Sequence, residues 1–351
     1  LESFERIFEE MPNVTKISLS NVTFPTNLVD CTCLFRNCSK LTDLTITGKN
    51  NVRLKPSDAQ YMFYGLKEMT NFDNAFLGID FSNCTSLYCT FHDCSSLKTI
   101  DISSLDLRRV SSLDSTFKNC INLVSVIGLE TQSTPMLTTI NNMFQYCHSL
   151  TRLDLSNLGS KNYVTIDTYT KDAWDSNCSF YSCNALKYLD LSNLKIKERA
   201  NGLFRGLSNL ETLKMNNTTW RDINNNGYFG YMMPPNATTI ELDGLVLEDS
   251  NIRVDSMFAS CTRLTSVDIS TINFSYIKTV WRMFYNCKGL NSINLSNHTN
   301  LSKIENFNEM FLGCSNLITV DITGTALPNA KTFVNMFRGC SNLQEIIGLE
   351  T

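Results

Sequence analysis

The sequence predicts an α/β solenoid with a parallel sheet on its concave face and short helices on its convex face. Two observations lead to this prediction. The segment Met310 to Thr323, MFLGCSNLITVDIT, recurs with few changes at Met257 to Ser270 and at Met336 to Gly348. Within each copy, the spacing of apolar residues changes from that of a helix to that of a strand. Such units stack and bury a continuous core that no single unit could form.

One aromatic position, numbered zero here, marks each unit. It falls at Phe8, Phe35, Phe63, Phe91, Phe117, Phe144, Phe180, Phe204, Tyr231, Phe258, Phe284, Phe311 and Phe337. Most steps between them are 26 to 28 residues, a period within the range of leucine-rich repeats. We therefore expect one leucine-rich-repeat solenoid of about thirteen units over residues 1–351. Because Leu1 already stands in register without a polar cap, the chain is expected to be part of a longer array.

Each unit is expected to contain a helix followed by a strand. In the unit of Phe311, apolar residues at positions −7, −4, 0 and +3 are three or four apart, which predicts a helix of about three turns. Val320 and Ile322, at +9 and +11, are two apart and point to the same side of a short strand.

Three segments depart from the repeat, at residues 50–61, 158–178 and 220–231. Loops added to a solenoid often carry its binding function. The alternative is neutral variation in length, which we favour for the first segment. The other two contain aromatic residues of the kind common in protein contacts, and these are candidate binding residues: Tyr163, Tyr169, Trp174, Trp220 and Tyr228.

The strand predicts a second candidate surface. Position +10 lies between the two inward residues and faces outward. It is Asp101, Asp154, Asp190, Asp268 and Asp321 in five units, with Asp73, Glu241 and Asn294 in others and Tyr188 nearby. This acidic face could bind a basic protein segment or a glycan, or it could be a solvated surface that discourages aggregation. One Asp per unit offers too few oxygens for Ca²⁺, so no metal site is expected.

Nine of the fourteen cysteines occupy position +3. This regularity predicts a ladder of buried free thiols, which behave as small apolar residues. Cys33, Cys89 and Cys178 lie at −2, five residues before a ladder cysteine. On a helix this spacing is too long for a local disulfide, so free thiols are expected there too, with a disulfide or a metal site as the alternatives.

The motif M-F-x-x-C-x-x-L, followed by a strand with Asp, resembles the BspA-like leucine-rich repeats known as DUF285 or the bacterial surface protein repeat. The resemblance covers nearly all of the chain. It implies a cell-surface or secreted protein engaged in adhesion, with no catalytic residues and no cofactor.

Composition and motifs exclude several other functions. A net charge of −4 gives no basic field for nucleic acid. The sequence contains no run of 18 apolar residues, so membrane insertion is not expected. The three histidines share no site, and no hydrolase, nucleotide or zinc-protease motif is found, so we expect a protein that is not an enzyme.

The function expected first is therefore recognition or adhesion at a cell surface, with a protein or glycan as ligand. A second hypothesis is a structural array, in which neighbouring copies of the chain assemble into a coat or filament. A third is an intracellular interaction scaffold, which free thiols would favour.

Overall fold

The computed structural model describes residues 3–159, 161–166, 179–197, 203–204, 206–221, 232–248 and 253–348. The chain divides into two compact units, Leu1–Leu186 and Lys187–Thr351. Each is a parallel β-solenoid, and the chain has about 11 turns, so thirteen repeats are not confirmed. A single solenoid over the whole chain stays a prediction.

Short parallel strands recur along the described part of both units. The first unit contains β1 (Lys16–Val22), β2 (Val29–Asp30), β3 (Asp43–Gly48), β4 (Pro56–Asp58), β5 (Thr99–Asp101), β6 (Ser125–Ile127), β7 (Arg152–Asp154) and β8 (Tyr163–Val164). The second contains β9 (Tyr188–Asp190), β10 (Lys195–Lys197), β11 (Thr212–Lys214), β12 (Thr219–Arg221), β13 (Thr239–Glu241), β14 (Val246–Leu247), β15 (Ser292–Asn294), β16 (Thr319–Asp321) and β17 (Glu345–Ile347).

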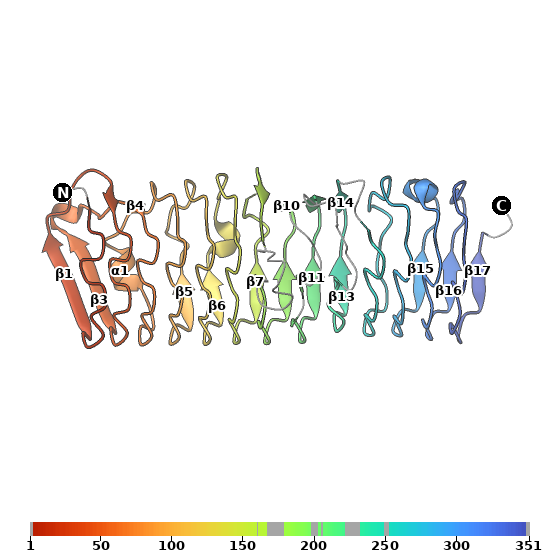
Figure 1. Cartoon of the computed structure of the whole chain (residues 1–351), viewed down its shortest axis with the longest axis horizontal. Coiled ribbons are helices and arrows are strands. Elements are labelled where there is room, and N and C mark those ends of the chain that lie inside the picture. Colours follow the sequence, from red (N-terminus) through yellow and green to blue (C-terminus); the bar gives the residue numbers. More distant parts are fainter. Residues whose placement is uncertain are drawn as a thin grey trace. The chain divides into compact units, whose positions relative to one another are not determined.

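The strand expected around position +10 is confirmed for most units, where it covers positions +8 to +10. In the second unit, β9, β11 and β13 pair in register through Leu189, Leu213 and Ile240, which are all buried at position +9. β15, β16 and β17 pair in the same way, as β5 and β6 do in the first unit (Figure 1). A further row of strands, β10, β12 and β14, was not expected from the sequence.

The helices expected at positions −7 to +3 are wrong for the described residues. The described residues contain few helical segments, and these lie outside positions −7 to +3. They are η1 (Lys49–Asn51), α1 (Asp73–Phe76), η2 (Leu129–Thr131) and η3 (Thr299–Lys303). The expected helix is instead a series of turns. The N–H of Phe35 donates to the carbonyl of Met62 in the next coil (2.9 Å), and the N–H of Arg36 donates to Cys33, three residues back (3.2 Å).

Left-handed residues explain why no helix forms. Backbone φ is positive at positions −2 and +2 of nearly every described coil, and two such residues four apart interrupt a right-handed helix. Alternate N–H groups then point to the neighbouring coil, so the backbone is satisfied by stacking. The residues concerned include Cys33, Asn37, Tyr61, Gly65, Cys89, Asp93, Ser115, Asn119, Ser256, Ser260, Arg282, Asn286, Glu309, Gly313, Asn335 and Gly339.

Stacked phenylalanines form the centre of both cores. The rings at position zero lie parallel from coil to coil, with centroids 5.8 Å apart for Phe35 and Phe63 and 4.9 Å apart for Phe258 and Phe284. Apart from Cys340, which is half-buried, the described cysteines are buried, and all of them are free. The prediction of free thiols at Cys33 and Cys89 is therefore confirmed, although the helix on which it rested is absent. Cys178 lies outside the described residues.

Candidate functional site

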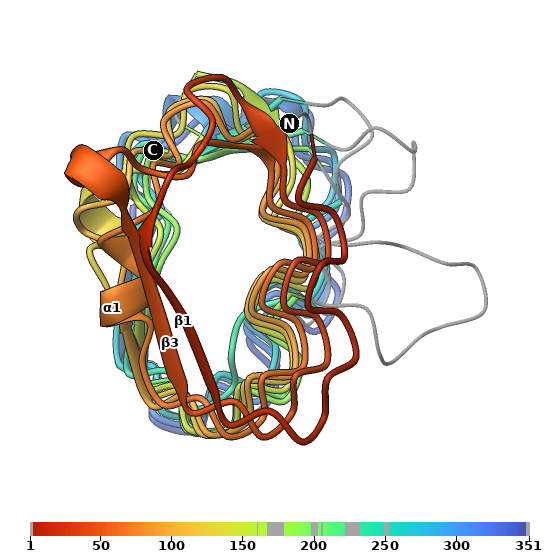
Figure 2. The same ribbon diagram turned by 90° about the vertical axis from the view of Figure 1, so that its left-hand side faces the viewer.

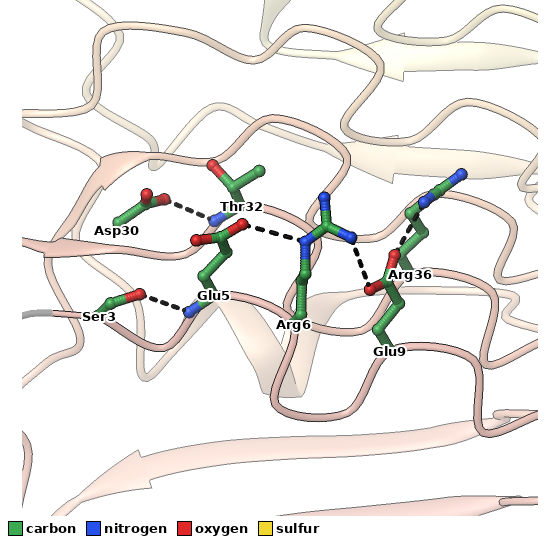
Figure 3. A network of polar contacts seen from close by, with 7 residues as sticks. All are labelled: Ser3, Glu5, Arg6, Glu9, Asp30, Thr32 and Arg36. Carbon is green, nitrogen blue, oxygen red and sulfur yellow. Dashed lines mark hydrogen bonds and ion pairs between the residues drawn. The ribbon is translucent and has the colours of Figure 1, made fainter.

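The carboxylates at position +10 hold the turns that follow the strands. Five of them accept a hydrogen bond from the backbone N–H two residues on, as Asp101 does from Ser103 (2.8 Å) and Asp321 from Thr323 (2.9 Å). Asp154, Asp190 and Asp268 do the same. Asp30 caps its own turn through Thr32 in the same manner (2.9 Å; Figure 3). The recurrent Asp is therefore a structural element of the coil.

These hydrogen bonds also favour the charged carboxylate. Bonds from the side chain and the backbone N–H of the residue two positions on lower the pKa of Asp101 and of Asp268, where that residue is Ser103 and Ser270. For Asp321 the backbone N–H of Thr323 is the main cause of the lowered pKa. Asp101, Asp268 and Asp321 are therefore ionised at neutral pH.

The acidic face is interrupted in both units. In the first, Asp101 is in register with Ile127. In the second, Lys214 lies between Asp190 and Glu241, and its Nζ is 3.0 Å from Glu241. The pKa of Lys214 is raised mainly by the hydrogen bond to Glu241. At these places the registered neighbour of Asp101, of Asp190 and of Glu241 is an isoleucine or a lysine and not a second carboxylate.

The aromatic candidates are distributed differently from what the sequence indicated. Trp220 in β12 is 0% exposed, so its role as an exposed contact residue is wrong. Tyr163 in β8 is half-buried. Tyr188 is also half-buried, and its hydroxyl donates to Asp190 (3.0 Å). The remaining candidates, Tyr169, Trp174 and Tyr228, lie outside the described residues.

A hollow of about 560 Å³ lies beside α1 in the first unit. We name it the α1 hollow. Its apolar lining includes Phe76, Ile79, Phe81 and Leu105, and Leu77 stands at its edge, 63% exposed. Its polar lining includes four aspartates and one arginine: Asp73, Asp80, Asp101, Asp106 and Arg53.

The helix α1 explains why a hollow forms there. Asp73 holds position +10, where a strand was expected, but Asp73–Phe76 turns into a short helix that packs beside β3 (Figure 2). The next strand of that row, β5, therefore has a helix and not a strand before it. The sequence difference in this unit is Phe72 at position +9, where the strands of the other units have Ile, Leu or Val.

A second hollow, of about 330 Å³, lies between β6 and β7 and is named the β6–β7 hollow. Val126, Ile127, Leu129 and Leu153 give it an apolar lining, and Glu130, Arg152 and Asp154 add charges. Ile127 is 48% exposed. Asp73, Asp101 and Asp154 are thus the residues of the predicted acidic face that line hollows, whereas Ile127 was not predicted.

The described residues offer little for catalysis. No group of three or more His, Cys, Asp or Glu within these ranges could hold a metal ion. His148 and His298 each bond a backbone carbonyl through one ring nitrogen. No helix in the described part of the chain is long and apolar enough to cross a membrane.

Comparisons with known proteins agree with the repeat. The family described as "Mycoplasma protein of unknown function, DUF285" matches residues 29–158 and 249–349. The "BspA type Leucine rich repeat region (6 copies)" matches residues 159–233. No curated protein matches the chain.

Several solved structures are similar to the chain. A leucine-rich repeat protein from Bacteroides ovatus is 18% identical over 95% of this chain and 86% of its own, with a TM-score of 0.43. A leucine-rich cell surface protein from Faecalibacterium prausnitzii is 18% identical over 99% of this chain and 83% of its own, with a TM-score of 0.34. An internalin from Listeria monocytogenes is 13% identical over 95% and 87%, with a TM-score of 0.30.

Proposed function

The chain belongs to the DUF285 family, with repeats of the BspA leucine-rich type, and from this premise we propose that it is a recognition module of a cell surface. It binds a protein ligand through the strand face of its first unit and has no catalytic activity. Leucine-rich repeats generally act in protein interaction.

The pair of hollows is the observation that supports this proposal best. Elsewhere on the strand face, carboxylates cap turns or pair with Lys214. At the hollows, apolar side chains reach the surface next to charged ones, as they do at the centre of protein interfaces. The hollows have the volumes of small-ligand pockets but are open at the surface.

A protein fits this surface better than a glycan does. Sugars are commonly held on an exposed aromatic ring, and the two rings of the α1 hollow, Phe76 and Phe81, are 7% and 2% exposed. Exposed Leu77 and Ile127 instead offer aliphatic area, which favours another protein.

Binding assays on defined proteins test the proposal. The chain would be exposed to a panel of purified extracellular-matrix and mucosal proteins, and in parallel to a glycan array. We expect a panel protein to bind, and Ile127→Glu to weaken that binding at least tenfold, roughly 1.4 kcal/mol. The matched control is Ile318→Glu, since Ile318 is 41% exposed in the second unit and lines neither hollow.

Three outcomes would contradict the proposal. If Ile127→Glu and Ile318→Glu weakened binding equally, the strand face of the first unit would be excluded as the binding surface. Binding to glycans alone would favour the glycan hypothesis. Self-association into filaments without ligand binding would favour the structural array.

A further inference from the structure

We propose that the α1 hollow and the β6–β7 hollow form one site for an extended protein segment, which inserts a lysine or arginine into the first and an apolar side chain into the second. This inference rests on the proposed function and adds the chemistry of the partner.

The α1 hollow suits a long cationic side chain because its floor and its rim differ. The apolar part of its lining that reaches solvent is Leu77, 63% exposed, and half-buried Leu105, with Phe76, Ile79 and Phe81 buried beneath them as a floor. Lysine and arginine place aliphatic stems along such surfaces and keep the charged group at the edge. A purely apolar side chain would fill the floor but leave the charges of the rim without a partner.

The rim carries more negative charge than its own residues neutralise. Four aspartates face one arginine, Arg53. Asp106 forms an ion pair with Arg108, which lies outside the hollow, with Nη2 2.6 Å from Oδ2. Asp80 uses Oδ1 for the N–H of Ser82 (3.0 Å). Among the described residues, no hydrogen bond or ion pair engages the carboxylate of Asp73. A cation from a partner complements this charge.

The β6–β7 hollow differs in its electrostatics. Arg152 lies 3.5 Å from Asp154, so these two charges neutralise each other beside the apolar lining. Glu130 is the remaining charge. Half-exposed Ile127 then offers contact area to an aliphatic or aromatic side chain.

The separation of the hollows sets the spacing in the ligand. Asp101 lines the first hollow and its registered neighbour Ile127 lines the second. The nearest walls of the two hollows are one strand spacing apart, about 4.8 Å, and their centres about two spacings, roughly 9.6 Å. An extended segment advances about 3.3 Å per residue, and successive side chains alternate in direction. The two inserted side chains therefore belong to residues two positions apart, about 6.6 Å along the segment.

A random peptide library displayed on phage is a suitable probe, selected on the intact chain. We expect selected peptides to contain Lys or Arg two residues from an apolar residue. The variant Asp73→Asn/Asp80→Asn/Asp101→Asn should weaken their binding at least about fivefold at low salt, and added salt should reduce the difference. An Asn side chain retains Oδ1, as Asn294 shows in accepting from the N–H of Ser296 (2.8 Å).

Asp30→Asn is the matched control, because Asp30 caps a turn of the same unit but lines neither hollow. Selected peptides without basic residues, no enrichment at all, or equal losses in Asp30→Asn and the triple variant would each overturn the inference. If panel proteins lose affinity in Ile127→Glu but not in the triple variant, the proposed function stands and the cationic partner is wrong. If neither variant affects them, both proposals fail.

Discussion

The thiol of Cys314 donates a hydrogen bond to the carbonyl oxygen of Phe284 in the preceding coil, with Sγ 3.0 Å from the oxygen. The same oxygen also accepts a hydrogen bond from the N–H of Cys287, three residues later in its own coil (3.1 Å). The thiol at +3 thus gives a second hydrogen bond to the backbone carbonyl oxygen of the phenylalanine at position zero in the preceding coil. The relationship recurs at Cys38, Cys94, Cys120, Cys147, Cys183, Cys287 and Cys340.

Replacing a ladder cysteine should therefore cost both packing and a hydrogen bond. We expect Cys314→Ala to lower the free energy of unfolding by roughly 1–2 kcal/mol. The measurement is the urea midpoint of the intact chain. Cys340→Ala is the comparison, because Cys340 is only half-buried and should cost less. Equal losses at the two positions would mean that burial of the ladder does not determine its contribution.

Burial of the thiols also predicts instability at alkaline pH. Desolvation raises the pKa of Cys84, Cys183 and Cys261 from 9.0 to about 12. The unfolded chain therefore releases these protons above pH 9 while the folded chain retains them. Their contribution is complete below pH 9 and is lost as pH rises toward 12.

Urea midpoints measured between pH 8 and pH 11 would check this. We expect the midpoint to fall across this range, and to fall less steeply in Cys183→Ala, which has one titrating thiol fewer. An identical slope in the variant would show that other groups cause the alkaline loss.

The left-handed residue at +2 should be sensitive to a side chain. Gly313 has a φ of +80°, and a Cβ there would lie 2.2 Å from Oδ1 of Asn286. Gly313→Ala must therefore strain the backbone and displace Asn286, at a cost of about 1–2 kcal/mol. The thermal midpoint of the variant measures it. Lys288→Ala, at an exposed position, is the control, and a similar stability of the two variants would contradict the requirement.

The recurrent aspartate is expected to act through its turn. Asp268→Asn keeps an oxygen for the N–H of Ser270 and should change stability little, whereas Asp268→Ala should cost about 1 kcal/mol. Because the folded-state pKa of Asp268 is lowered, its contribution is present above the ordinary Asp range and declines as pH falls below it. Urea midpoints at pH 7 and pH 3 measure both effects. A loss in Asp268→Asn equal to that in Asp268→Ala would show that charge, and not the cap, matters.

Sequence periodicity was sufficient to identify the core, the thiol ladder and the strand at +8 to +10. These features depend on which side chains are buried, and the burial of side chains leaves a periodic pattern in the sequence. The helix was wrong because spacings of three and four are shared by a helix and by the turns of a coil. Asn, Asp and Gly at +2, as in Asn37, Asp93 and Gly313, indicated the difference through their tolerance of positive φ.

By itself, then, the sequence determined the repeat, its family and the residues that face inward. Only the tertiary structure decided that Trp220 is buried, that Lys214 separates Asp190 from Glu241, and that α1 leaves a hollow next to β5. The physical reason is that core residues are selected by a local pattern, whereas a surface is formed by side chains about 27 residues apart. Those side chains become neighbours only when the coils stack in register.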